Sequence, residues 1–375
     1  MTFSVAFLYD YLDRGGVEKH LYQLIKFLSE NHVACHIIAE TSDYFRQKIG
    51  EFDIQVHPLP KSNSGVRNIA DLSRLMKKEN IDILHIHHSK VSIIGRIAAL
   101  IAKTKSIVTV HLNPKDYLSS PSFSKTTKLW LFTQIDKMLN WWITDRLIFV
   151  STSVYQYYVS KKLAPANRSR VITNGIDLKL YQNPESGDKL RSAIGVLEDE
   201  VVLMFLGRLE EQKGPDILLE AFHEIEKDLG NIKLLIVGEG PQKDKLLQQA
   251  EVAGVLDHVK FLGWREDIPD LLNTADVFIL PSRYEAFPYV LLEAMASGLP
   301  CIASGVGDIP LIIQPDLNGI LVPPNDAKAL SKTIQLLIQN ETLRRELGKT
   351  AREAVKKYPL AIALHQMMET YLEVI

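Results

Sequence analysis

Short apolar runs alternate with longer helix-compatible segments along the whole chain, and this alternation constrains the fold more than any other feature. The runs are rich in β-branched residues, and most are continuously apolar, as expected of strands that are buried on both faces. Helical segments between such strands are typical of parallel sheets with crossover helices. A first series comprises FSVAFLY, ACHIIAE, DILHIHH, SIVTVHL, RLIFVS and SRVITN, and a second comprises VVLMFLG, IKLLIVG, VKFLG, DVFILP, PCIAS and GILVP. The sequence therefore predicts an α/β protein with two parallel sheets.

The two series predict two doubly wound, Rossmann-like domains. A polar, turn-rich segment, NGIDLKLYQNPESGDKLRS, separates them, and 375 residues exceed the usual size of one core. We expect an N-terminal domain over residues 1–180, a second domain over 181–357, and a C-terminal helix over 358–375 that returns to the first domain. Ligands of such sheets bind at the carboxyl ends of the strands, so two facing domains predict an interdomain cleft.

Composition excludes several classes of protein. Lys and Arg number 43 against 45 Asp and Glu, and this near balance argues against a general nucleic-acid binder. Cys35 and Cys301 lie far apart in apolar runs, so we interpret both as buried thiols. The N-terminus lacks the features of a signal peptide, and no apolar stretch reaches the roughly 18 residues that span a bilayer. We expect a cytoplasmic protein.

The segment PSRYEAFPYVLLEAMASG, residues 281–298, places Glu285 and Glu293 in an apolar context. A buried carboxylate needs hydrogen-bond donors or a cation, and the neighbouring sequence offers no obvious partner. Our hypothesis is that Glu285 accepts hydrogen bonds from sugar hydroxyls and that Glu293 binds a vicinal diol such as ribose. Pro288 is expected at the first helical position, where the free amides of the helix start favour an anion. The alternative is that an Arg or Lys of a neighbouring element pairs with Glu293.

The segment LGRLEEQKGPDILLEAF places Arg208 and Lys213 in one strand-to-helix loop. Two fixed cations suit a diphosphate, because they stabilise a leaving group on which negative charge grows. The alternative is that both are solvated surface residues. Gly15 and Gly16 follow the first strand without forming a GxGxxG pattern, which disfavours a dinucleotide oxidoreductase.

Histidines gather in DILHIHHSK, as His85, His87 and His88, and His111 ends the next strand. A zinc site needs about three or four convergent ligands, so we do not expect a metal here. His111 is placed to hydrogen-bond a substrate hydroxyl or phosphate. No DxD pair occurs in the chain, which leaves no ready carboxylate site for Mg²⁺ or Mn²⁺.

The segment KTTKLWLFTQIDKMLNWWITDR combines lysines with aromatic residues at helix-compatible spacing. They are Lys125, Lys128, Lys137, Trp130, Phe132, Trp141 and Trp142. This pattern predicts either a helix that contacts a membrane surface through residues 125–142 or a helix that packs on the core.

Six motifs in this order resemble the retaining glycosyltransferases of family 4, also called glycosyl transferases group 1, which have the two-domain GT-B fold. The motifs are GGVE near the start, TVH at 109–111, VITNGID at 171–177, GRLEEQKG at 207–214, VGEGP at 237–241 and PSRYEAFPYVLLEAMASGLP at 281–300. The last one matches the E-x7-E motif of the family. The resemblance covers nearly the whole chain.

The resemblance implies a role for each matching residue. Arg208 and Lys213 would hold the nucleotide diphosphate, Glu293 the ribose hydroxyls, and Glu285 and His111 would be catalytic residues near the transferred sugar. Donor binding would also involve the turn that follows the first motif glutamate, the glycine-rich turn near the start of the chain and two residues near the nucleobase. These are, in the same order, Phe287, Pro288 and Tyr289, then Gly16, then Trp264 and Arg265.

The resemblance also implies an activity. We expect transfer of a hexose-type sugar from a nucleotide diphosphate, UDP above all, to a glycan or lipid-linked glycan in bacterial surface polysaccharide or glycoconjugate synthesis, without a metal cofactor. Alternatives are a non-catalytic GT-B subunit that partners another glycosyltransferase, and a nucleotide-sugar epimerase or phosphorylase of similar fold. Asp308 and Leu311 depart from the family pattern near the expected donor sugar, and Ala286 replaces a commoner glycine.

Overall fold

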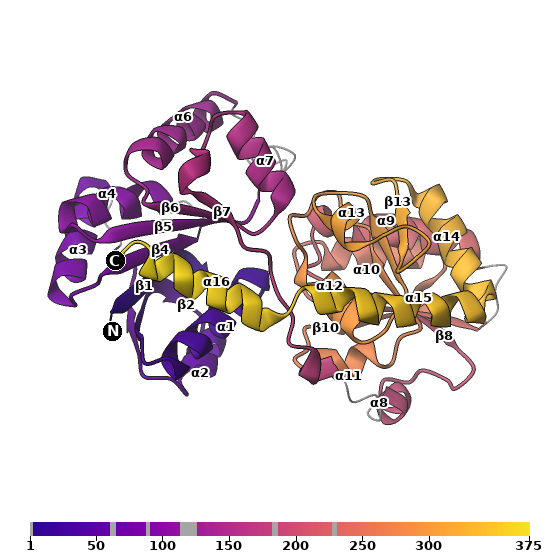
Figure 1. Ribbon diagram of the computed structural model, residues 1–375. Helices are drawn as coiled ribbons and strands as arrows, with labels where there is room; N and C mark the ends of the chain where they lie inside the picture. Colours follow the sequence, from indigo (N-terminus) through magenta and orange to yellow (C-terminus); the bar gives the residue numbers. More distant parts are fainter. Residues whose placement is uncertain (1–2, 61–64, 88–90, 113–125, 182–186, 227–230) are drawn as a thin grey trace. The chain divides into compact units, whose positions relative to one another are not determined.

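The computed structural model describes residues 3–60, 65–87, 91–112, 126–181, 187–226 and 231–375, which form two compact units (Figure 1). Unit 1 comprises Met1–Asn174 and Ile362–Ile375, and unit 2 comprises Gly175–Ala361. The sequence placed the boundaries at 180/181 and 357/358. The last residues of the chain thus belong to unit 1.

Unit 1 is built on a seven-stranded parallel sheet in the order β3-β2-β1-β4-β5-β6-β7. The strands are β1 (Ser4–Leu12), β2 (Ala34–Thr41), β3 (Ile54–His57), β4 (Ile83–His87), β5 (Lys105–Val110), β6 (Arg146–Phe149) and β7 (Ser169–Val171). The order reverses between β1 and β4, because the chain builds outward to β3 before it returns to the other side of β1.

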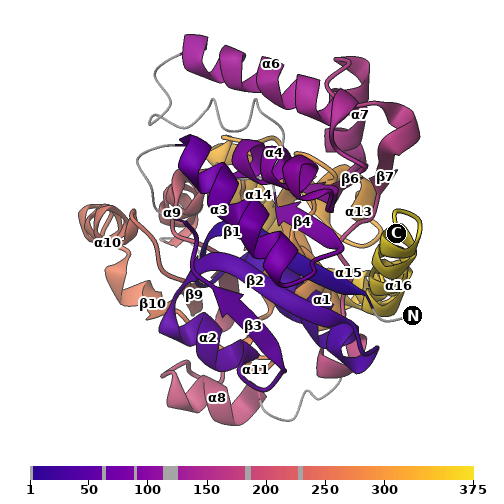
Figure 2. The same cartoon turned by 90° about the vertical axis from the view of Figure 1, so that its left-hand side faces the viewer.

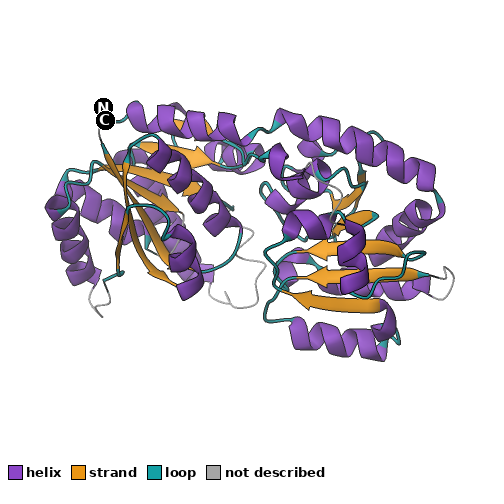
Figure 3. Cartoon of the chain, turned by 90° about the horizontal axis from the view of Figure 1, so that it is seen from below, coloured by secondary structure: helices purple, strands orange, loops and turns teal. Residues whose placement is uncertain are grey.

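Helices cover both faces of this sheet (Figure 3). They are α1 (Gly16–Glu30), α2 (Asp43–Ile49), α3 (Gly65–Lys78), α4 (Ser92–Ala102), α6 (Thr126–Trp142), α7 (Thr152–Ser160) and α16 (Leu360–Leu372). On one face α1, α2 and α16 pack against Val5 and Phe7 of β1. On the other face α4 lies so close to the sheet that a Cβ at Gly95 would overlap Leu8. Figure 2 shows α3, α4 and α6 grouped on this side, where α4 contacts both neighbours.

Unit 2 is built on a six-stranded parallel sheet in the order β10-β9-β8-β11-β12-β13. The strands are β8 (Val201–Leu206), β9 (Ile232–Val237), β10 (Val259–Gly263), β11 (Val277–Leu280), β12 (Cys301–Ser304) and β13 (Ile320–Val322). Its helices are α8 (Gly187–Ala193), α9 (Pro215–Glu226), α10 (Lys243–Val252), α11 (Ile268–Leu272), α12 (Tyr289–Ala296), α13 (Ile309–Ile312), α14 (Ala327–Gln339) and α15 (Glu341–Ala354). The order reverses between β8 and β11.

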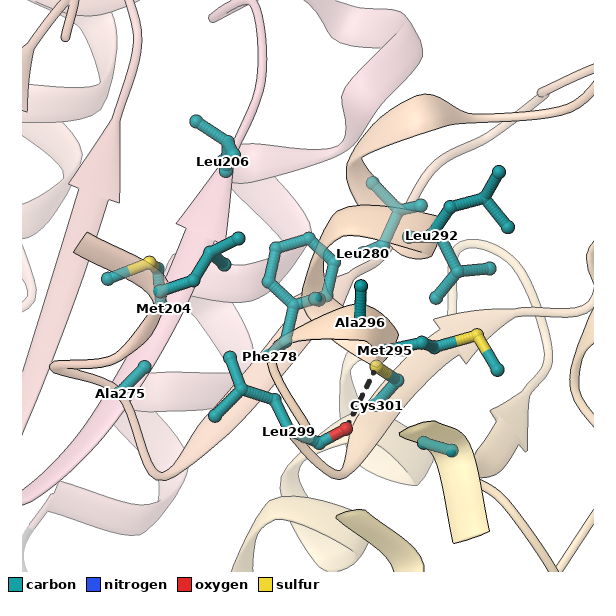
Figure 4. Packing of buried hydrophobic residues seen from close by; sticks show 14 of the residues in the cluster. Met204, Leu206, Ala275, Phe278, Leu280, Leu292, Met295, Ala296, Leu299 and Cys301 are labelled. Atoms are coloured by element: carbon teal, nitrogen blue, oxygen red, sulfur yellow. Dashed lines mark hydrogen bonds between the residues drawn. The ribbon is translucent and has the colours of Figure 1, made fainter. Parts of the chain in front are cut away.

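Strand residues of unit 2 alternate between two cores, as the two-residue period of a strand requires. Met204 and Phe278 face α12 and its neighbours, whereas Phe205 and Ile279 face α9 and α14. Figure 4 shows the first core, in which the Phe278 ring lies among side chains of β8 and α12. Cys301 is buried there, and its thiol donates to the carbonyl of Leu299.

All twelve predicted apolar runs contain strands, and the α/β class with two parallel sheets is confirmed. The sequence missed β3, because this edge strand is short and has no buried position to mark it. Cys35 and Cys301 are free, buried thiols, as predicted, and burial raises the pKa of Cys35 to about 12.

Candidate active site

The loops after β8 and β11 meet at the point where the strand order of unit 2 reverses. Ligands of doubly wound sheets bind at such reversals, outside the carboxyl ends of the strands. The loop after β8 carries residues 207–214, and the loop after β11 carries residues 281–288. The motif at 207–214 and the start of the motif at 281–300 therefore lie next to each other in the fold.

Backbone contacts join these two loops. The amide of Arg283 donates to the carbonyl of Gln212 over 2.8 Å, and the side-chain amide of Gln212 donates to the carbonyl of Tyr284 over 3.1 Å. Gly214 has a φ of 67°, and a Cβ there would overlap the carbonyl oxygen of Pro281. Glycine at this position allows the loops to approach closely.

Lys213 and Glu285 form an ion pair between the loops. Nζ of Lys213 lies 2.6 Å from Oε1 of Glu285, and the hydroxyl of Ser282 donates to the same oxygen over 2.8 Å. The two charged side chains are 18% and 5% exposed. The neighbouring sequence offers no obvious partner for Glu285, but the fold supplies one from 72 positions away, the lysine that we assigned to the diphosphate.

Arg283 and Asp216 form a second pair beside the first. Two guanidinium nitrogens of Arg283 donate to the two carboxylate oxygens of Asp216 over 2.8 and 2.7 Å. Burial opposes ionisation of Asp216, but the hydrogen bonds and charge of Arg283 outweigh it and lower the pKa of this carboxyl. Sequence reasoning missed both residues, since neither belongs to a spacing that singles it out.

Glu293 is buried on α12 and accepts a hydrogen bond from the hydroxyl of Tyr181 over 3.1 Å. Burial, followed by the charge of Glu293, raises the pKa of both Tyr181 and Tyr289. Glu293 thus has a hydrogen-bond partner within the chain, and this partner is a tyrosine that sequence reasoning did not consider. Tyr181 comes from the linker, where its 3₁₀ turn (Leu178–Tyr181) gave no signal of a site.

The start of α12 lies at the end of the second loop. Pro288 is the N-cap of this helix rather than its first helical residue, with φ −73° and ψ 121°, so our expectation was one position off. Phe287 and Tyr289 are buried, and the Phe287 ring packs edge-on against Tyr358 with 5.2 Å between ring centroids. The side chains of this turn thus anchor the backbone on the core.

Arg208, Trp264 and Arg265 follow the carboxyl ends of β8 and β10. The Arg208 side chain is 68% exposed and lies 3.5 Å from Glu210. Arg265 donates to both oxygens of Asp267 over 2.8 and 2.5 Å. Trp264 is half-buried beside it. Arg208 therefore differs from Lys213, which is held in place by its partner.

Gly16 and His111 lie in unit 1, at the carboxyl edge of its sheet. Gly16 begins α1, and His111 directly follows β5. Nε2 of His111 lies 3.0 Å from Nδ1 of His87, the last residue of β4, and the two rings are nearly parallel. His20 of α1, which sequence reasoning missed, packs its ring edge-on against both.

His85 lies deeper on β4. Its Nδ1 is 2.7 Å from the hydroxyl of Tyr371 on α16, and its Nε2 is 2.7 Å from the hydroxyl of Thr109. Burial, and then the neighbouring histidines, lower the pKa of His85 and His87 well below the usual value. Within the described residues no group of three or more His, Cys, Asp or Glu side chains is arranged to hold a metal ion. His88 lies outside the described residues.

The aromatic segment at 125–142 forms α6 from residue 126 onward, and it has two different faces. Asp136 and Asn140 are buried, and both accept hydrogen bonds from Arg96 of α4. The outer face exposes large apolar side chains, namely Trp130, Leu131, Met138, Trp141 and Trp142. A surface cavity of about 420 Å³ lies there, lined by Gln134, Lys137, Met138, Trp141, Trp142 and Lys162.

The buried Asp136 and Asn140 agree with a helix that packs on the core, whereas contact of the outer face with a membrane stays a prediction. Lys125 lies outside the described residues, as does the side chain of Lys128. No helix in the part of the chain that the structure describes is both long and apolar enough to cross a membrane.

Comparison with known proteins shows the family of this chain. Two family models match: Glycosyltransferase Family 4 over residues 14–180 and Glycosyl transferases group 1 over residues 187–354. The N-acetyl-alpha-D-glucosaminyl L-malate synthase of Bacillus anthracis is 30% identical over 76% of this chain and 72% of its own length. The UDP-Gal:alpha-D-GlcNAc-diphosphoundecaprenol alpha-1,3-galactosyltransferase of Escherichia coli is 28% identical over 83% and 80%.

Solved structures share the fold. HepE of Anabaena, crystallised with UDP and glucose, superposes with a TM-score of 0.85 at 23% identity, covering 99% of this chain and 100% of HepE. A glycosyltransferase of Rickettsia africae gives a TM-score of 0.83 at 20% identity, over 100% and 98% of the two chains. The chain belongs to glycosyltransferase family 4, and it is a glycosyltransferase with the GT-B fold.

Proposed function

We propose that this enzyme transfers a hexose-type sugar from a UDP-sugar to a hydroxyl of a glycan or lipid-linked glycan, with retention of the anomeric configuration. The bond between the anomeric carbon and the diphosphate breaks, and its electron pair leaves with the nucleotide. The acceptor oxygen then bonds to the same face of the sugar, and its proton passes to an oxygen of the departing diphosphate. Negative charge grows on the diphosphate during this step, and its stabilisation is what the protein must supply.

The observation that carries the proposal is the Lys213–Glu285 pair at the strand-order reversal of unit 2. Glu285 holds the lysine ammonium at a fixed place, and positive charge fixed before the reaction stabilises a leaving group more than mobile charge does. The more exposed Arg208 supplies a second cation for the same diphosphate.

The other site residues complete the donor site in this proposal. Glu293 binds the ribose hydroxyls, and the turn formed by Phe287, Pro288 and Tyr289 presents backbone amides to the sugar. We assign contact with the diphosphate to Gly16 and contact with the transferred sugar to His111. Contact with the base is assigned to Trp264 and Arg265.

We propose that no metal takes part, because Lys213 and Arg208 provide the charge that a divalent ion otherwise brings to a diphosphate. Names of relatives support the donor and acceptor classes. The E. coli relative is named for UDP-Gal and a diphosphoundecaprenol-linked acceptor, and HepE was crystallised with UDP-glucose. We place the activity in bacterial surface polysaccharide or glycoconjugate synthesis, in the cytoplasm.

We further propose peripheral contact between α6 and the inner face of the cell membrane. Among its residues with described side chains, the outward charge is Lys137, whereas Asp136 is turned inward and paired with Arg96. Exposed Trp142 and Met138 beside Lys137 and Lys162 combine apolar surface with positive charge, which suits an anionic bilayer.

The transfer reaction is tested with a panel of nucleotide sugars, by measuring nucleotide release and the anomeric configuration of the product, with and without EDTA. We expect release from one UDP-sugar in the presence of acceptor, retention, and no effect of EDTA. Interconversion of sugars without acceptor indicates an epimerase, and no release from any donor contradicts the proposal.

Membrane contact is tested by sedimentation with anionic vesicles. We expect Trp142→Gln with Met138→Gln to lower the bound fraction, while Val252→Gln, an exposed apolar residue of unit 2, leaves it unchanged. Equal binding of the folded double variant and the wild type contradicts the contact.

A further inference from the structure

His87 and His111 form a pair at the carboxyl edge of the sheet of unit 1, and one ring nitrogen of His87 determines which nitrogens of the pair carry protons. His87 is fully buried, and its Nε2 has no hydrogen-bond partner among the described residues. Its Nδ1 lies 3.0 Å from Nε2 of His111. A neutral imidazole carries one N–H and one lone pair, so only one of its two nitrogens donates.

Two arrangements of the proton are possible between these nitrogens. If His111 donates from Nε2, then His87 accepts at Nδ1 and must carry its own proton on the buried Nε2, where no acceptor lies. If His87 donates from Nδ1, its Nε2 carries only a lone pair. Buried N–H groups without an acceptor are rarer than buried acceptors without a donor, so the second arrangement is favoured.

The surroundings of the pair support a neutral His87. Burial lowers the pKa of His87 well below the usual value, and the adjacent His85, His111 and His20 lower it further. The rings of His87 and His111 lie 22° from parallel, and His20 packs edge-on against both. The stacked ring of His87 and the edge-on ring of His20 therefore restrict rotation of the His111 ring.

We infer that His87 is a positioning residue that donates from Nδ1 to Nε2 of His111 and so fixes the proton of His111 on Nδ1. His111 then presents a hydrogen-bond donor to its ligand, and its remaining lone pair is occupied by His87. A consequence is that His111 does not take up the acceptor proton. This inference rests on the proposed function only for the identity of the ligand oxygen.

The test uses the full-length protein with ¹⁵N-labelled histidine, in which chemical shifts distinguish a protonated from an unprotonated ring nitrogen. The spectrum of His111→Ala identifies the His111 signals. We expect the wild type at neutral pH to carry the proton on Nδ1 of His111. A proton on Nε2, or on both nitrogens, overturns the inference even if no sugar transfer is found.

Two variants separate positioning from simple packing. Asn places its side-chain amide near the position of a histidine Nδ1, so His87→Asn keeps the donor, whereas His87→Leu removes it. We expect His87→Leu to move the His111 proton toward Nε2. We also expect it to lower kcat about tenfold, the lower end of the loss seen when partners that orient metal-binding histidines are removed. His87→Asn is expected to retain the Nδ1 proton and most of kcat.

The matched control is a second histidine pair in the same unit. Nδ1 of His36 on β2 lies 3.2 Å from Nε2 of His57 on β3, with nearly parallel rings. His36→Leu is expected to change neither the His111 shifts nor kcat. An unchanged His111 tautomer in a folded His87→Leu, or loss of the Nδ1 proton in His87→Asn, overturns the inference. If His87→Leu does not fold, the wild-type and His87→Asn spectra decide.

Discussion

Nζ of Lys213 lies 2.6 Å from Oε1 of Glu285, and this ion pair joins the loops that follow the two central strands of unit 2. The two side chains of this ion pair differ in how far they are exposed to solvent. Glu285 is almost wholly buried, while Lys213 has a long stem and an 18% exposed side chain. Loss of the lysine leaves a buried carboxylate, whereas loss of the glutamate leaves an ammonium that can reach water.

We therefore predict that Lys213→Ala destabilises the protein by about 3 kcal/mol and Glu285→Ala by less, because breaking a buried pair costs most when the isolated charge stays buried. The double variant Lys213→Ala/Glu285→Ala should recover part of this stability. It should not recover transfer, because the leaving group then has only the more exposed Arg208 and lacks the cation of Lys213. Urea unfolding and nucleotide release measure the two effects. A double variant no more stable than Lys213→Ala contradicts the asymmetry.

Gly214 and Gly254 offer a matched test of how closely the two loops approach. Both have positive φ, 67° and 72°, but a Cβ at Gly254 would meet nothing within 4 Å, whereas one at Gly214 would overlap the carbonyl oxygen of Pro281. Alanine at either position carries a left-handed strain of about 1 kcal/mol. Gly214→Ala should cost about 2 kcal/mol more, because the loops must separate.

The same two variants connect loop packing to activity. Because Lys213 precedes Gly214, Gly214→Ala should lower kcat while Gly254→Ala leaves it at the wild-type value. Steady-state rates at saturating donor give the comparison. Equal kcat values in the two folded variants show that the loop contact does not position Lys213 for the reaction.

Sequence reasoning found the loops of unit 2 but not the partners within them. Continuous apolar runs locate buried parallel strands, and residues just after a strand must lie at the ligand-binding edge. The side-chain partners could not be predicted in this way, because Lys213 and Glu285 are 72 positions apart and Tyr181 and Glu293 are 112 apart. Nothing in local spacing encodes such contacts, which arise from the strand order.

Unit 1 shows the same limit. His111 was identifiable because it ends a strand, whereas His20 looked like an ordinary residue of an amphipathic helix. Its contact with the strand-end histidines depends on how α1 packs over the sheet. The segment at 126–142 was ambiguous for a physical reason, since α6 buries Asp136 on one side and exposes Trp142 on the other. Helix spacing alone does not tell which aromatic residues face the core.

Glu293 provides a test of ribose recognition that is independent of catalysis. A site that hydrogen-bonds a hydroxyl discriminates against a ligand that lacks it. We predict that the wild type binds UDP about tenfold more tightly than its 2′-deoxy analogue, since a hydrogen bond to a charged group contributes about 1.5 kcal/mol or more. Glu293→Gln should lose most of this discrimination, as measured by calorimetry.

Glu285→Gln is the control for that experiment, because our proposal assigns Glu285 to holding Lys213 beside the diphosphate and not to the ribose. It should keep the preference for UDP over the deoxy analogue. Equal discrimination by the wild type and Glu293→Gln shows that Glu293 serves to hold Tyr181 and the linker rather than the nucleotide.

The buried histidines of unit 1 predict how stability depends on pH. Burial lowers the pKa of His20 to about 4, and the pKa values of His85 and His87 also lie well below 6.5. The unfolded chain binds protons at these residues near pH 6.5, while the folded protein does not. The contribution of these neutral histidines to the free energy of unfolding is therefore fully present above pH 6.5 and is lost as the pH falls toward 4.

We predict that the free energy of unfolding decreases from pH 7 to pH 5, a range that lies above the protonation of most carboxylates. His20→Phe keeps an aromatic ring against His87 and His111 but cannot be protonated, so its free energy of unfolding should depend less steeply on pH. Urea unfolding of both proteins at several pH values provides the measurement. The difference between the two slopes isolates His20, because the carboxylates are common to both proteins. Identical slopes mean that His20 is protonated as readily in the folded protein as in the unfolded chain, which contradicts its burial against the neighbouring rings.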